Sequence, residues 1–179
     1  MMDALFDTAL TFGFSAVASV EPKKLTVQSA VRAMCAANRC HAYHRNWTCP
    51  PECGTLEQCA AAISSCTAGV LLQTTGYLED SFDYEGMMAL EKQHLSRFHA
   101  FCEQIRKKYP NALCLGSGGC RICKVCAYPD LCRFPEKACS SMEAYGLLVS
   151  DVCKLCGIPY YYGENTLSYT ACVLLPNTL

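Results

Sequence analysis

Apolar side chains recur at helical spacing through the middle of the chain. Successive intervals of 7, 3, 4, 3 and 4 residues connect Met88, Leu95, Phe98, Cys102, Ile105 and Tyr109. This spacing puts all six side chains on one face of a helix. Pro110 follows and is expected to end that helix. The pattern therefore predicts a long amphipathic helix over residues 82–109.

Shorter apolar stripes with the same spacing predict three more helices, at residues 27–35, 55–68 and 140–156. The second begins with a T-x-x-Q capping signal at Thr55 and Gln58, and Gly69 is expected to end it. The third begins with an S-x-x-E capping box at Ser140 and Glu143. A capping box explains Glu143 without any role in chemistry.

Four short runs of apolar and β-branched residues predict strands: FSAVASV (14–20), GVLLQTT (69–75), ALCLG (112–116) and SYTACVLL (168–175). Strands that alternate with helices predict an α/β layer fold with a mostly parallel sheet. We therefore expect a single domain over residues 1–179, in which helices flank a small, mostly parallel sheet. Two cysteine-rich loops interrupt this alternation, and loops between regular elements are free to wrap a ligand.

Composition excludes several classes of protein. Hydrophobic residues make up 51% of the 179 residues, which fits a globular protein. The formal net charge of −1 offers no strong field for nucleic acid or a membrane surface. We find no apolar run long enough to span a membrane and no basic start typical of an export signal. Sixteen cysteines in a protein expected to be cytoplasmic favour metal binding over disulfides.

The second cysteine-rich loop, GGCRICKVCAYPDLCRFP (118–135), carries the most specific motif. Cys120, Cys123 and Cys126 have C-x2-C-x2-C spacing, and Cys132 is a candidate fourth ligand. A run of this kind is typical of iron–sulfur sites, whereas structural zinc sites favour separated pairs. Gly118 and Gly119 would allow close approach of the backbone to a cluster.

The first cysteine-rich loop, CAANRCHAYHRNWTCPPEC (35–53), offers four more thiols: Cys35, Cys40, Cys49 and Cys53. Its spacing is a weak signal alone, but beside the second loop it makes a second site plausible. Cys49 is followed by proline, and in two-cluster ferredoxins the cysteine before proline ligates the other cluster. Whether Cys49 or Cys132 completes the set begun by Cys120 stays open at this point.

The remaining cysteines and the histidines favour ordinary structural roles. Apolar positions of predicted helices or strands are occupied by Cys59, Cys66, Cys102, Cys114, Cys156 and Cys172, where a thiol packs as a small hydrophobe. The roles of Cys139 and Cys153 stay open. His41 and His44 are expected to be solvated loop residues, although they could also orient a cluster or donate protons. His94 and His99 are expected on the surface of the long helix.

Two segments resemble the predicted metal-binding protein family called domain of unknown function 2284. They are VRAMC…C…Y…W-x-CPP (31–51) and GGCRICKVCAYPDLCRFPEKACSSMEAYGLLV (118–149). The resemblance implies a small cytosolic protein of anaerobes that binds metal, as an iron–sulfur group. The ligands it implies are Cys35, Cys40, Cys49, Cys120, Cys123, Cys126 and Cys132, so Cys53 is an addition. It also marks Arg32, Arg133, Ser141, Glu143 and Gly146. The charges of the two arginines could offset a thiolate-bound cluster.

These observations predict an iron–sulfur protein that carries one or two 4Fe-4S clusters and transfers electrons as a carrier or redox subunit. A cluster-dependent enzyme of the reductase or lyase type is the first alternative, because seven family cysteines are one short of two complete sets. An open iron site would then bind a small substrate. A zinc-stabilised interaction module is the second alternative. The expected partner is a redox protein or a small molecule.

Overall fold

A long antiparallel pair of strands forms the centre of the sheet. In the computed structural model, which describes residues 2–176 and side chains from residue 5 onward, β2 (Cys66–Tyr77) pairs with β5 (Thr166–Pro176). β1 (Ala16–Val20) pairs with the outer side of β2, also antiparallel. β3 (Leu113–Gly116) pairs antiparallel with the other side of β5, and the two-residue β4 (Ser140–Ser141) lies parallel to β3. The sheet order is β1-β2-β5-β3-β4.

The predicted α/β class is confirmed, but the expectation of a mostly parallel sheet is wrong. Strands β2, β3 and β4 do run in one direction, as a strand–helix–strand alternation predicts. The last strand, β5, runs in the opposite direction and inserts between β2 and β3. This insertion creates two antiparallel pairings, and β1 is also antiparallel to β2, so three of the four pairings are antiparallel.

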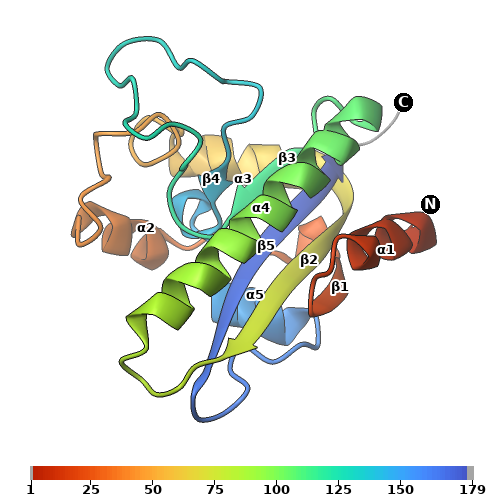
Figure 1. Cartoon of the computed structure of the whole chain (residues 1–179). Helices are drawn as coiled ribbons and strands as arrows, with labels where there is room; N and C mark the ends of the chain where they lie inside the picture. The colour runs from red at the N-terminus through yellow and green to blue at the C-terminus, as the bar shows by residue number, and fades with distance from the viewer. Residues whose placement is uncertain (1, 177–179) are drawn as a thin grey trace.

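Helices cover both faces of the sheet (Figure 1). α4 (Tyr84–Lys108) and α1 (Met2–Thr11) pack on one face, while α3 (Leu56–Ser64) and α5 (Val149–Leu155) pack on the other. Residues of β5 alternate between the two cores: Ala171, Val173 and Leu175 face α4, and Cys172 and Leu174 face α5. This alternation follows from the two-residue period of a strand.

The start of α3 confirms its predicted capping signal, whereas its predicted end at Gly69 is replaced by strand pairing. Thr55 and Gln58 form the predicted capping box, with Gln58 N–H donating to Thr55 Oγ1 at 3.2 Å. α3 ends at Ser64, so the expectation that Gly69 ends it is wrong. Gly69 lies within β2, where a Cβ would come within 2.7 Å of Val173 O, so glycine permits the strands to approach.

The predicted helix over residues 140–156 is wrong in its first half. Ser140 and Ser141 form β4, a 3-10 turn η2 (Glu143–Tyr145) follows, and α5 begins only at Val149. The capping function belongs to Ser141, whose Oγ accepts the Ala144 N–H at 3.1 Å. Pairing of β4 with β3 therefore displaces the capping box, and Glu143 has no helix to cap.

Two short elements on the N-terminal side complete the fold. α2 (Ser29–Ala36) leads into the first cysteine-rich loop, and the 3-10 turn η1 (Pro22–Lys24) follows β1.

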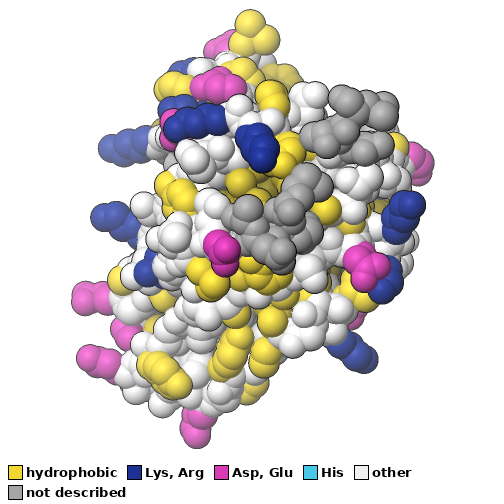
Figure 2. Space-filling view, turned by 90° about the vertical axis from the view of Figure 1, so that its right-hand side faces the viewer, with side chains coloured by type: hydrophobic (Ala, Val, Ile, Leu, Met, Phe, Trp, Pro, Cys, Tyr) yellow, Lys and Arg dark blue, Asp and Glu magenta, His cyan; other side chains and the backbone are white. Residues whose placement is uncertain are grey.

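No helix in the described part of the chain combines the length and apolar character that a membrane crossing requires. On the face that carries the chain ends, basic and acidic side chains are interspersed and neither sign forms a patch (Figure 2).

Candidate metal centre

The two cysteine-rich loops lie side by side, and the second loop leaves the sheet at the carboxyl end of β3 (Figure 1). The first loop connects α2 to α3, and the second connects β3 to β4. Ligand sites of α/β sheets commonly lie at this end of parallel strands, where backbone is free of the sheet. The sheet thus holds the start and the end of the second loop in fixed positions.

Polar contacts join the two loops. Trp47 Nε1 donates to Asp130 O at 2.7 Å, and Tyr128 Oη donates to Glu52 Oε1 at 2.9 Å. Glu52 Oε1 also lies 2.7 Å from His44 Nδ1. The rings of Trp47 and Tyr128 meet edge to face at 5.1 Å. These contacts fix the first loop against the second, and they give His44 a partner that the prediction of a solvated imidazole lacked.

A cavity of about 460 Å³ separates the loops, and we call it the interloop cavity. Its wall includes four thiols, from Cys35, Cys40, Cys49 and Cys120. Gly118, Gly119, Ser141 and Glu143 also line this cavity. Cysteines about seventy residues apart in the sequence are thus brought to one space.

A narrower space of about 20 Å³ lies behind the second loop, and we call it the second-loop crevice. It is lined by the four thiols of Cys120, Cys123, Cys126 and Cys132, together with Trp47 and Phe134. Its volume suits little more than a water molecule. Cys120 and Asn46 border both spaces, and Cys120 is the thiol that the two groups share.

The backbone around Cys120 leaves space beside its sulfur and donates hydrogen bonds to it. Gly118 adopts a φ of +71°, which L side chains rarely adopt, and a Cβ at Gly119 would lie 3.7 Å from Cys49 Sγ. Amide N–H groups of Ile122 and Cys139 hydrogen-bond to Cys120 Sγ and lower the pKa of that thiol, although burial raises it more. Amides directed at sulfur are expected around thiolate-bound metal groups.

The thiols of the interloop cavity influence one another electrostatically. Burial raises the pKa of Cys49 to about 11, and neighbouring charge on Cys40, Cys35 and Cys120 adds to the effect. Burial also raises the pKa of Cys35, followed by the charge of Glu143. Several anions would therefore repel one another here, which is the condition that a bound cationic metal relieves.

Cys53 lies apart from both spaces. Its thiol hydrogen-bonds to Cys59, and Cys53 Sγ lies 3.6 Å from Ala144 O. Arg32 belongs to the same group, because its Nη2 donates to Cys59 Sγ at 3.2 Å and both Nη atoms donate to Gly54 O at 3.0 Å. The Cys53 hydrogen bond, with Arg32, lowers the pKa of Cys59 to about 7. Arg32 still lies near enough to Cys35 to act on its charge.

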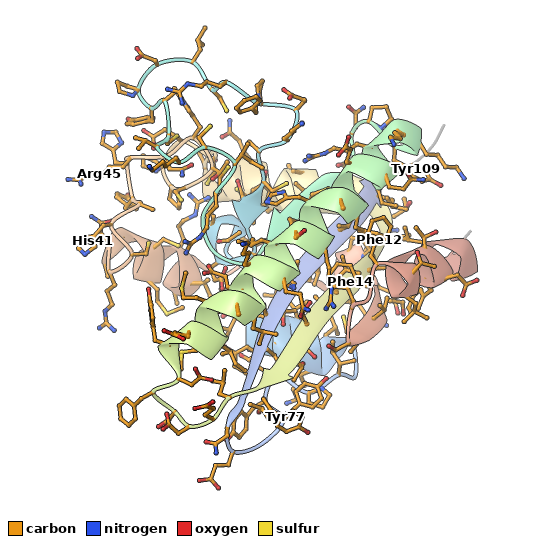
Figure 3. All side chains as sticks on the ribbon, viewed as in Figure 1. Phe12, Phe14, His41, Arg45, Tyr77 and Tyr109 are labelled. Atoms are coloured by element: carbon orange, nitrogen blue, oxygen red, sulfur yellow. The ribbon has the colours of Figure 1, made fainter. Side chains whose placement is uncertain are left out.

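Of the remaining predicted residues, Arg133 borders a thiol site, whereas His41, His94 and His99 do not. Arg133 lines the second-loop crevice, but its side chain is exposed and its Nη1 donates to Val125 O at 3.4 Å. His41 is exposed on the first loop (Figure 3). The prediction that His94 is a surface residue is wrong: its side chain is 0% exposed and its Nδ1 lies 3.0 Å from Thr74 Oγ1. His99 is half-buried.

A third group of thiols includes one at the end of the second loop, and the spacing of cysteines in the sequence did not predict this group. Cys102, Cys114 and Cys139 come from α4, β3 and the end of the loop, and all three are buried. Hydrogen bonds from Cys102 and Cys114 lower the pKa of Cys139, and Arg106, whose Nη2 lies 3.5 Å from Cys139 Sγ, acts in the same direction. Cys102 and Cys114 are core residues, as predicted.

Sequence reasoning missed the loop contacts and underestimated one carboxylate. Trp47 and Tyr128 lie in the two segments that resemble the family, but no sequence pattern predicts their contacts, and Glu52 belongs to no motif. The predicted helix cap at Glu143 is absent from the structure, and Glu143, which the family resemblance also marks, lines the interloop cavity with the thiols instead.

The match to known families is consistent with this geometry. A family model described as predicted metal-binding protein, domain of unknown function 2284, matches residues 18–175. No curated protein and no solved structure matches the chain. The matched region contains both loops and the sheet that holds them. The chain therefore belongs to the predicted metal-binding protein family, domain of unknown function 2284.

Proposed function

We propose that this chain is an iron–sulfur protein that transfers single electrons, with one metal group at each of the two adjoining thiol sites. The observation that carries the proposal is the position of Cys120, which borders both the interloop cavity and the second-loop crevice. Two redox groups in adjoining sites provide an entry and an exit for an electron.

The donor set supports iron–sulfur groups over a single ion. A tetrahedral zinc ion needs its sulfurs about 2.3 Å from one point. Within the described residues, no three side chains of His, Cys, Asp or Glu are grouped so that they could hold a metal ion. A cluster places each thiolate on a different iron, so its ligands are spread more widely than those of a single ion.

The second-loop group would be held by Cys120, Cys123, Cys126 and Cys132, and the interloop group by Cys35, Cys40 and Cys49. When bound, such groups supply reversible one-electron chemistry. The crevice is narrow, so the second loop, which has no regular secondary structure over residues 117–139, would have to move outward to admit such a group. The chain's own contribution is to hold the loops together through Trp47 and Tyr128 and to exclude water.

An enzyme with an exchangeable metal position is the second candidate, and the interloop cavity favours it. Its volume of about 460 Å³ lies in the range of small-molecule sites. Three family cysteines there leave one position without a thiol. A small substrate, rather than a partner protein, would then receive the electron.

The proposed setting is the reducing cytoplasm of an anaerobe, with a redox protein as partner. All sixteen cysteines are free thiols, which fits a reducing compartment. Val125 and Leu131 on the second loop are 73% and 89% exposed, so the outer edge of this loop offers apolar contact to a partner.

Anaerobic purification followed by iron, acid-labile sulfide and zinc analysis tests the proposal. We expect iron and sulfide in similar amounts and a reversible redox signal. Cys123→Ser should remove the signal of one group and Cys40→Ser that of the other, while Cys172→Ser, in the core, should remove neither. Stoichiometric zinc in a colourless protein without sulfide would refute the proposal.

A further inference from the structure

We propose that the Glu143 carboxylate is the fourth ligand of the interloop group, beside Cys35, Cys40 and Cys49. This inference rests on the proposed function and deepens it. It gives that site a ligand set of three thiolates and one carboxylate, and it makes the carboxylate corner the exchangeable one.

The position of Glu143 supports this role. Glu143 lines the interloop cavity with all three thiols, and its charge acts on Cys35. The turn that carries Glu143 is closed by a backbone hydrogen bond, in which Gly146 N–H donates to Glu143 O at 2.9 Å. Among the described residues, however, its carboxylate has no hydrogen bond and no ion pair. A half-buried carboxylate directed into a cavity without a partner is available to a ligand.

Nearby cations are engaged elsewhere. Arg121 also lines the cavity, but its Nη2 lies 2.8 Å from Glu91 Oε1. Arg32 donates to Gly54 O and Cys59 Sγ. The cavity therefore gathers a carboxylate and several thiols without a cation paired to the carboxylate, and a bound metal group would supply the missing positive charge.

The backbone holds Glu143 in a fixed relation to the helix that carries Cys35. Gln28 N–H donates to Gly146 O at 2.8 Å and so joins α2 to the turn after Glu143. Gly146 has a φ of +76°, and a Cβ there would lie 2.9 Å from Val27 Cγ1. Such close packing positions a ligand in advance of binding, which a mobile surface glutamate could not do.

The number of ligands supports the same conclusion. Cys120, Cys123, Cys126 and Cys132 form one set of four around the second-loop crevice. The interloop set then has three thiols, and Cys53 does not complete it because its thiol is directed to Cys59 and Ala144 O. Glu143 is the acidic side chain in the cavity wall. Thiolates suit iron–sulfur groups better than carboxylates do, so this corner would exchange most readily.

Mössbauer and electron paramagnetic resonance spectra of the anaerobically loaded full chain test this assignment without an activity assay. We expect a minority iron signal, distinct from the thiolate-bound irons, in the wild type and in Glu143→Asp. Glu143→Cys should convert that signal to the thiolate type. Glu143→Gln should lose iron from the interloop group alone. Glu136→Gln, an exposed carboxylate of the second loop, serves as the matched control and should match the wild type.

The outcomes separate this inference from the proposed function. If the wild type holds neither iron nor sulfide, both are overturned. If the wild type holds two groups but the spectra of Glu143→Gln and Glu143→Cys equal those of the wild type, only the role of Glu143 is overturned. Urea unfolding of the metal-free variants checks the fold, and because the carboxylate has no partner we expect unchanged midpoints.

Discussion

The buried His94 makes the stability of this protein depend on pH in a way that can be calculated. Its ring stacks on Phe98, with the ring planes 4° apart, and contacts Phe14 edge to face at 6.0 Å. Nδ1 lies 3.0 Å from Thr74 Oγ1, and the buried Nε2 has no partner within the described residues. Burial lowers the pKa of His94 from 6.5 to about 4, with smaller contributions from the charges of Arg97 and His99.

The sign of the effect follows from the lowered pKa. Between pH 6.5 and 4 the unfolded chain binds a proton at this position and the folded chain does not, so acid favours unfolding. The stabilisation is fully present above pH 6.5 and is lost as the pH falls toward the folded pKa. A difference of 2.5 pKa units at 1.36 kcal/mol each gives about 3 kcal/mol of stability lost by pH 4.

Urea unfolding of the wild type and of His94→Asn at pH 7.5 and pH 4 measures this contribution. Asn replaces the titrating ring but retains a group that can bond to Thr74. The free-energy difference between wild type and variant should shrink by about 3 kcal/mol at the lower pH. Ile105→Val, a cavity-forming control further along the same helix and away from His94, should show a difference that does not change with pH. An equal difference for His94→Asn at both pH values would refute the reasoning.

Three further substitutions have defined expectations. Gly146→Ala should destabilise the fold by about 1–3 kcal/mol in urea unfolding, because φ is +76° and the new Cβ meets Leu56 Cδ1 at 2.7 Å; wild-type stability would contradict the close packing. Thr55→Ala should cost about 1 kcal/mol through the lost capping box, with metal content unchanged. Cys172→Ser should cost about 1–3 kcal/mol by burying a hydroxyl, again without loss of metal; loss of iron in this variant would argue against a core role for the thiol.

Local periodicity predicted most elements because burial alternates along each of them. The stripe on α4 was correct at Phe98, Cys102 and Ile105, which are buried, although Met88 is 39% exposed. The direction of the sheet could not be predicted in the same way. It depends on β5 inserting between β2 and β3, and that choice is made by contacts between strands about a hundred residues apart. The helix α1 was not predicted at all.

The candidate site, like the fold, could be predicted only where its residues lie close together in the sequence. Cysteine spacing alone identified the second loop, since its four candidate ligands lie within one short segment. The direction of Cys53 and of Glu143 depends on how the first loop is held against α3 and η2, which no spacing rule contains. The sequence therefore indicated eight candidate thiols. It did not show that Cys53 lies apart from the others, or that the carboxylate of Glu143 lines the cavity wall instead.

Trp47 has a practical consequence beyond its contact with Asp130. It is the single tryptophan of the chain, and it forms part of the crevice wall beside Cys120 and Cys123. Its indole hydrogen bond spans the two loops, so any movement of one loop against the other changes the surroundings of the fluorophore. The protein thus carries a built-in optical reporter, and its emission would follow metal loading and loop opening in real time without an attached label.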